Sequence, residues 1–186
     1  MDGLSGYAAG MPVLLSPRLL LLPLTRPVLE RRLAGAPFSL TLDTPHGAQD
    51  VYFPPEWPGD ALPLFQTWLA NLGDGPDGVP GTFIAVHRGH LSALGQLGVK
   101  GTLSAAGEQE IGYGLTPDAR GRGYATEAVG ALVTHLHAQG VALVTARTSP
   151  DNRASGRVLQ KLGFRQVGTD SGAPDGPLLL WAHAPA

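Results

Sequence analysis

The chain of 186 residues is predicted to form one α+β domain, with a mixed, mainly antiparallel central sheet and helices on both faces. Apolar periodicity gives the order strand, two helices, three strands, helix, strand, helix and two strands. The composition is 43% hydrophobic and 15% charged, which is typical of a globular protein and not of a disordered one. We expect the domain to span residues 1–186, with residues 1–10 as a loose arm.

The first half is predicted to contain one strand and two helices. Residues 18–22 are an arginine and four leucines bounded by prolines, which is typical of a strand buried on both faces. A helix is predicted at 27–34, with a proline near its start and a glycine past its end. A second helix is predicted at 60–72. The segment 36–60 between them is interpreted as a loop whose aromatic rings either wall a pocket or cover a core edge: Phe38, Tyr52, Phe53 and Trp57.

The second half alternates strands with helices. Apolar segments at 82–87 and 94–104 flank a short turn and predict an antiparallel hairpin, and 110–115 continues as the next strand. Residues 124–139 show the clearest helical periodicity, which ends at a glycine. The remaining elements are expected in the order strand 141–148, a helix that begins after Asp151 or Asn152 as N-cap and ends at Gly163, and closing strands at 164–167 and 178–183.

Charge and composition exclude several classes of function. A formal net charge of -2 gives no general basic face, so no nucleic-acid partner is expected. The absence of cysteine removes disulfides, thiolate metal sites and a cysteine nucleophile, and it fits a cytoplasmic protein. The apolar run at 13–24 is too short and too interrupted to span a bilayer, so no membrane partner is expected. His135 and His137 are two apart on a helix and cannot chelate together, so no metal is expected.

The most informative stretch lies between Glu110 and Val129, where a strand, a glycine-rich turn and a helix follow one another. Arg120-Gly121-Arg122-Gly123 stands directly before the helical pattern. Backbone N–H groups at a helix N-terminus bind anions, and glycines let a phosphate approach those groups closely. The sequence therefore predicts an anion site at this turn, with two guanidinium groups beside it.

This turn resembles the acetyl-coenzyme A signature of the GNAT N-acetyltransferase superfamily, Arg/Gln-x-x-Gly-x-Gly/Ala. Arg120, Gly123 and Ala125 stand at its three fixed positions. The wider run from Ile111 is similar to the branch that contains the Rim-type ribosomal-protein N-acetyltransferases. The block from Asn152 to Phe164 agrees with that branch in residues and spacing, and residues 16–24 resemble its first strand. The resemblance implies a GNAT-like sheet and an N-acetyltransferase activity.

The resemblance further implies acetyl-CoA as co-substrate, with its pyrophosphate at the glycine-rich turn. In the family the pantetheine arm lies like an extra strand, here beside residues 111–116 and 143–149. Asn152 has two roles open to it, a hydrogen bond to the coenzyme and the N-cap of its helix. The residues expected to bind the coenzyme are Leu115, Arg120, Gly121, Arg122, Gly123, Tyr124, Ala125, Thr126 and Asn152.

The implied reaction is direct attack of a primary amine on the thioester in a ternary complex, which requires a base, an oxyanion donor and an acid. The family's oxyanion donor is a backbone amide of the strand at 111–116. Glu110 is the candidate base, and an exposed carboxylate at a strand end is the alternative. The tyrosine that many family members use as acid is replaced by Leu159. Ser155 is the substitute candidate, and capping of its own helix is the alternative.

Other classes of function stay open at this point. A dinucleotide-binding protein would need an acidic residue about twenty positions after the glycines, where the sequence has Thr145, Ala146 and Arg147. The missing tyrosine keeps open a non-catalytic module that binds acyl-CoA as a sensor or partner subunit. The expected acceptor is an amine-bearing small molecule or a protein N-terminus, and the Rim-type resemblance favours the protein N-terminus. We expect a monomer or homodimer.

Overall fold

The computed structural model describes residues 11–75, 77–174 and 176–185, so the predicted loose arm at 1–10 lies outside the described residues. Contacts divide the chain into two compact units. The first comprises the chain up to Gly98 together with Tyr113–Tyr124, and the second comprises Val99–Gly112 and the chain from Ala125 onward. Strands β6 (Ser92–Lys100) and β7 (Glu108–Leu115) belong in part to each unit.

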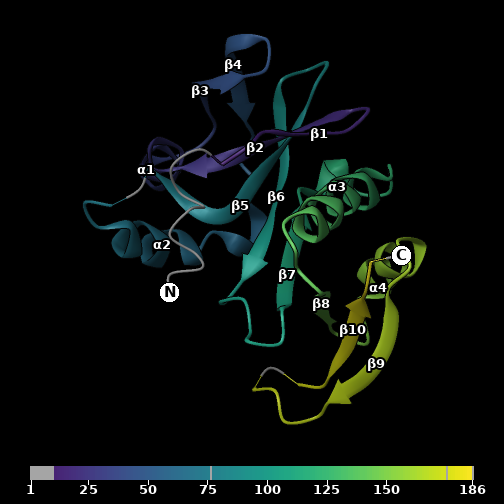
Figure 1. The fold of residues 1–186 in the computed structure, drawn as a ribbon. Coiled ribbons are helices and arrows are strands. Elements are labelled where there is room, and N and C mark those ends of the chain that lie inside the picture. The colour runs from purple at the N-terminus through teal and green to yellow at the C-terminus, as the bar shows by residue number, and fades with distance from the viewer. Residues whose placement is uncertain (1–10, 76, 175, 186) are drawn as a thin grey trace. The chain divides into compact units, whose positions relative to one another are not determined.

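The first unit is built on antiparallel strands in the order β1-β2-β5-β6. β2 (Leu19–Thr25) pairs on one edge with β1 (Leu14–Leu15) and on the other with β5 (Gly78–His87). The leucines of β2 are buried, which confirms the prediction of a strand covered on both faces. β5 pairs with β6 as the predicted antiparallel hairpin (Figure 1).

Residues 36–60 contain a hairpin, so the prediction of a loop in this segment is wrong. β3 (Phe38–Thr44) and β4 (Gly47–Phe53) pair antiparallel along their full length, and they lie together in Figure 1. The alternating burial of β3 matches its alternating apolar and polar residues, a period of two that identifies a strand. The prolines on either side of the hairpin, Pro37, Pro54 and Pro55, obscured this signal.

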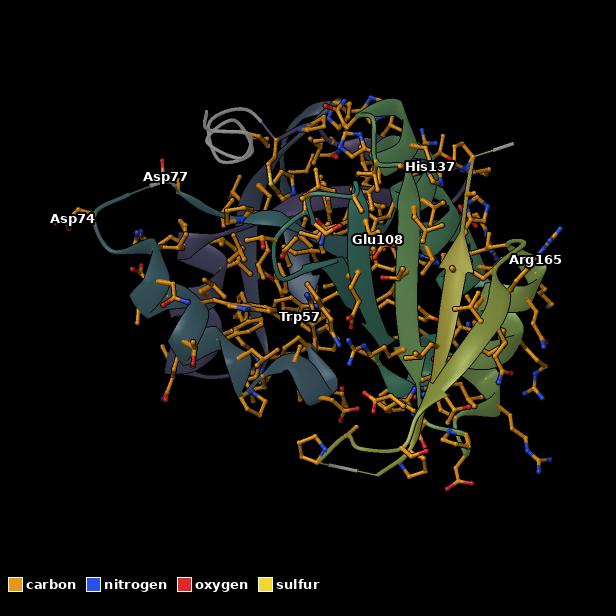
Figure 2. All side chains as sticks on the ribbon, turned by 60° about the horizontal axis from the view of Figure 1, so that its bottom comes forward. Trp57, Asp74, Asp77, Glu108, His137 and Arg165 are labelled. Atoms are coloured by element: carbon orange, nitrogen blue, oxygen red, sulfur yellow. The ribbon has the colours of Figure 1, made fainter. Side chains whose placement is uncertain are left out.

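The aromatic residues of this segment divide between the core and the surface. Phe38 stacks on Phe53 at 4.5 Å between ring centroids, and Trp57 meets Phe53 and Phe65 edge-on at 4.8 and 5.5 Å. Trp57, labelled in Figure 2, is fully buried and donates its indole N–H to a backbone carbonyl of β6 at 3.0 Å. These rings therefore cover a core edge, whereas Tyr52 is 43% exposed and lines a pocket.

Two helices complete the first unit. α1 (Arg26–Ala34) ends at a glycine, as predicted. The predicted helix at 60–72 is a 3₁₀ turn, η1 (Gly59–Ala61), followed by α2 (Leu64–Leu72). Pro63 stands at the N-cap of α2, where the missing N–H costs little. Phe65 and Leu72 of this segment are buried, and three further apolar residues pack half-buried against the same core: Leu62, Trp68 and Leu69.

The second unit has the strand order β7-β8-β10-β9. β7 and β8 (Leu143–Thr148) are parallel, and α3 (Tyr124–Ala138) connects them, because a parallel pair needs a long crossover. α4 (Arg153–Lys161) leads to β9 (Arg165–Asp170), which lies beside β10 (Leu178–His183) in Figure 1. The predicted α+β class with a mixed, mainly antiparallel sheet is confirmed. None of the helices in the described part of the chain is long and apolar enough to cross a membrane.

Candidate active site

The glycine-rich turn leads from β7 into α3 through a 3₁₀ turn. This turn, η2 (Pro117–Ala119), is closed by backbone hydrogen bonds of 3.0 and 3.1 Å that the carbonyls of Thr116 and Pro117 accept. Gly121 and Gly123 then adopt φ angles of 73° and 80°, in the left-handed region that other residues enter only with strain. The backbone conformation therefore favours glycine at both positions.

The N–H groups of the turn are available to a ligand. Among the residues that the structure describes, no carbonyl accepts from the N–H groups of Gly121, Arg122 or Gly123. All three residues are exposed. The first N–H groups of α3 also lack intrahelical partners, as at every helix start. The turn thus presents successive donors to solvent at the positive end of a helix dipole, an arrangement that binds phosphate groups.

The two arginines of the turn make different contacts. Arg120 turns back onto the preceding strand, where its Nε donates to the carbonyl oxygen of Leu115 at 3.2 Å. That bond fixes the guanidinium of Arg120 next to the end of β7. Arg122 instead lines a pocket, and its carbonyl oxygen accepts a hydrogen bond of 3.0 Å from Nη1 of Arg18.

A pocket of about 390 Å³ opens beside the turn within the first unit, lined also by the β5–β6 hairpin and the segment after β4. Tyr124 forms part of it, with the guanidinium of Arg18 4.5 Å from its ring centroid. His87 meets Tyr124 edge-on at 5.7 Å and stacks on His90 at 4.5 Å. The sequence alone does not predict that Arg18 and His87 reach this turn, because neither is near it along the chain.

The remaining predicted coenzyme contacts belong to the second unit. Ala125 and Thr126 lie half-buried in the first turn of α3. Asn152 is the N-cap of α4, and its Oδ1 accepts a hydrogen bond of 3.1 Å from the N–H of Ser155. The predicted capping role is confirmed, and the contact of Asn152 with a coenzyme stays a prediction.

Glu110 takes part in a network of ion pairs. Its Oε2 lies 3.1 Å from Nε of Arg147, and its Oε1 lies 3.6 Å from Nζ of Lys100. Arg147 also faces Asp170 at 3.6 Å. The Glu110 side chain is 23% exposed, so it is partly withdrawn from water and more ordered than a solitary carboxylate at a strand end.

The ladder between β7 and β8 stops before either strand ends. It runs from Glu108 opposite Leu143 to Ile111 opposite Ala146, whereas β7 itself continues to Leu115. Within the described residues, the ladder therefore covers only the first half of β7. Backbone groups beyond it are suited to pairing with an extended ligand, as in the addition of a strand to a sheet.

Leu159 and Ser155 share one face of α4, because residues four apart on a helix lie above one another. Leu159 is fully buried, so the position of the family's tyrosine is a core position in this chain. Ser155 lies one turn closer to the N-terminus of α4 and is half-buried. Within the described residues, Ser155 therefore carries the only hydroxyl group on this face of α4.

Two histidines of the second unit form a pair that the sequence does not predict. Nδ1 of His137, labelled in Figure 2, lies 2.8 Å from the carbonyl oxygen of Val141, and its Nε2 lies 2.9 Å from Nδ1 of His183. A carbonyl oxygen only accepts, so Nδ1 of His137 carries a proton and donates it to Val141. No cluster of three or more metal-ligating side chains occurs in the part of the chain that the structure describes.

This pair predicts that acid destabilises the fold. Burial lowers the pKa of His183 below its ordinary value of 6.5, and the His137 ring lowers that pKa further, against a backbone hydrogen bond that raises it. The unfolded chain then binds the proton more readily, so the stabilisation is complete above about pH 6.5 and is lost as the pH falls through the folded-state pKa. Urea unfolding between pH 7.5 and 5 should show a falling free energy. His183→Gln should flatten this slope, whereas His46→Gln, at an exposed turn position, should leave it unchanged.

The fold and the turn define a class of protein, an α+β domain in which a glycine-rich helix start is built to receive an anion. The family model described as "Acetyltransferase (GNAT) domain" matches residues 39–165. The chain belongs to the GNAT acetyltransferase family, and it is an acetyltransferase enzyme. This membership sets aside the dinucleotide-binding alternative.

Individual relatives agree with the family match. The uncharacterized N-acetyltransferase YjdG of Bacillus subtilis strain 168 is 32% identical over 114 residues, which cover 59% of this chain and 67% of the relative. A GNAT-family acetyltransferase from Bacillus anthracis has a similar fold, with a TM-score of 0.64, 17% identity and coverage of 93% of this chain and 98% of its own. RimJ of Mycobacterium smegmatis, solved with CoA-disulfide, gives a TM-score of 0.52 and 24% identity over 66% of this chain and 59% of its own.

Proposed function

We propose that this acetyltransferase moves the acetyl group of acetyl-CoA to a primary amine by direct attack in a ternary complex. The observation that carries the proposal is that Gly121, Arg122 and Gly123 are exposed before the start of α3 and that no backbone carbonyl of the described residues accepts from their N–H groups. A pyrophosphate is a multiple acceptor that matches such a row of donors. The relative RimJ, solved with CoA-disulfide, supports the choice of coenzyme.

The other predicted contacts follow from this placement. The arginines at 120 and 122 add positive charge near the phosphates, and Tyr124, Ala125 and Thr126 continue the turn into α3. The pantetheine arm is expected to pair with β7 beyond Ile111, where the β7–β8 ladder has ended, and Leu115 lies on this path. Asn152 is expected to donate a hydrogen bond to the coenzyme from its Nδ2, because its Oδ1 accepts the cap bond.

In the proposed reaction the lone pair of the amine nitrogen attacks the thioester carbonyl carbon. A backbone N–H of β7 stabilises the oxyanion, and the carbon–sulfur bond then breaks as the carbonyl re-forms. Glu110 accepts the proton that the attacking nitrogen loses, directly or through one water. The leaving thiolate takes a proton from the hydroxyl of Ser155, which recovers it from solvent. The products are the N-acetylated acceptor and CoA.

The proposed acceptor is the α-amino group of a protein or peptide, in keeping with the Rim-type resemblance and with RimJ among the structural relatives. Amine-bearing small molecules are the second candidate class. The two classes differ in size and in whether the amine is attached to a peptide backbone, so a panel of acceptors separates them.

The test measures thiol release from acetyl-CoA in the presence of peptides with free N-termini, the same peptides with blocked N-termini, free amino acids, polyamines and aminoglycosides. We expect CoA release that depends on the amine and is greatest for peptides with a free α-amino group. Turnover of small amines alone would refute the peptide assignment. Thermal stabilisation by acetyl-CoA without turnover of any amine would instead identify a sensor and refute the proposed reaction.

A further inference from the structure

We infer that Arg18 is a positioning residue for the coenzyme: it fixes the peptide between Arg122 and Gly123 so that the N–H of Gly123 faces the pyrophosphate. The inference rests on the proposed function, because it takes the glycine-rich turn as the site of that pyrophosphate. It adds a residue that lies outside the signature and more than one hundred positions before it in the chain.

One guanidinium group contacts three successive residues of the turn. Nη1 of Arg18 donates to the carbonyl oxygen of Arg122 at 3.0 Å. Its Cζ lies 4.5 Å from the ring centroid of Tyr124, a cation–π distance. Its Nη2 lies 3.4 Å from the point where a Cβ on Gly123 would be. The Arg18 side chain therefore covers the side of the turn toward which a side chain at position 123 would point.

The bond to Arg122 sets the direction of the next N–H. The carbonyl of Arg122 and the N–H of Gly123 belong to one planar trans peptide, in which the two groups point in opposite directions. A carbonyl held toward Arg18 turns the N–H of Gly123 away from it, to the open side of the turn. The positive charge at the carbonyl also polarises the peptide and so strengthens that N–H as a donor to an anion.

Arg18 is itself anchored by backbone contacts. Its carbonyl oxygen accepts a hydrogen bond of 2.9 Å from the N–H of Arg88, and Nη1 of Arg88 donates to the carbonyl oxygen of Ser16 at 3.0 Å. The next residue, Leu19, is fully buried at the start of β2. The guanidinium of Arg18 thus extends from the fixed start of β2. It links the glycine-rich turn, whose glycines give the backbone more conformational freedom, to this strand. Such preorganisation reduces the entropy lost when the coenzyme binds.

The test compares Arg18→Met with Arg26→Met, a matched control. The guanidinium of Arg26 also donates to a backbone carbonyl, that of Gly73 at 2.7 Å, away from the turn. Calorimetry with CoA should show a Kd about ten-fold higher for Arg18→Met, the size of one charge-assisted hydrogen bond, and a wild-type Kd for Arg26→Met. With acetyl-CoA and the best amine acceptor, KM should rise for Arg18→Met while kcat stays close to the wild-type value.

Arg18→Lys keeps the charge and the aliphatic stem but not the planar fork, so it should fold like the wild type and bind CoA with an intermediate Kd. A wild-type Kd for CoA in both Arg18 variants would overturn the inference. A fall in kcat at unchanged KM would also overturn it, because the residue would then act on the chemical step. Failure of the wild-type protein to bind CoA would refute the proposed function, and that result is visible before any variant is compared.

Discussion

Gly123→Glu is expected to abolish binding of acetyl-CoA while the domain stays folded. The new carboxylate would stand where the pyrophosphate is proposed to bind. A like charge about 4 Å away costs about 4 kcal/mol at an effective dielectric constant of about 20, which raises Kd roughly a thousand-fold. The new Cβ would also lie 3.4 Å from Nη2 of Arg18, in van der Waals contact with the side chain that covers the turn. Calorimetric titration with CoA measures the loss.

The matched control is Gly47→Glu, at the first residue of β4. Gly47 has a φ of 94° and nothing within 4 Å of its Cβ position, so it tests the same charge and the same backbone strain away from the turn. Both variants should lose about 1 kcal/mol of stability in urea unfolding, because both force a side chain into the left-handed region. Only Gly123→Glu should lose the coenzyme. Retained CoA binding by Gly123→Glu would refute the pyrophosphate assignment.

The parts of this site that the sequence predicts are those encoded locally. The left-handed glycines at 121 and 123 and the start of α3 lie within a few consecutive residues, so their pattern identifies an anion site without knowledge of the fold. The cap that Asn152 provides is local for the same reason, since its partner is three residues away. Side-chain to backbone bonds of this short range depend on one helix end alone.

The parts that the sequence does not predict depend on the sheet. Arg18 reaches the turn from 104 residues away, and His137 and His183 are 46 apart. These contacts depend on which strands are neighbours: Arg18 directly precedes β2, and His183 lies on β10, where a shift of one residue in register would turn its side chain to the other face of the sheet. The hairpin at 38–53 escapes prediction for a different reason: its period of two is present, but the flanking prolines indicate a loop.

Glu110→Gln is expected to lower kcat about one hundred-fold and to leave KM for acetyl-CoA unchanged, if the carboxylate is the general base. Glutamine has nearly the same shape but cannot accept the proton that the attacking amine loses. The ion pairs with Arg147 and Lys100 would be weakened as well. Partly exposed pairs of this kind contribute only about 0–1 kcal/mol, so the unfolding free energy should change little.

The control for the ion pairs is Asp170→Asn, which removes the second carboxylate that faces Arg147 and leaves Glu110 in place. A structural role of the network predicts equal losses of kcat in the two variants, since each releases the same arginine. If Glu110 is the base, the loss of kcat is confined to Glu110→Gln, and the acid limb disappears from the pH dependence of kcat in that variant. Equal losses, or a pH profile that Glu110→Gln leaves unchanged, would reject Glu110 as the base. The proton would then leave through water, and the ion pairs of Glu110 would serve to hold β7 against β8.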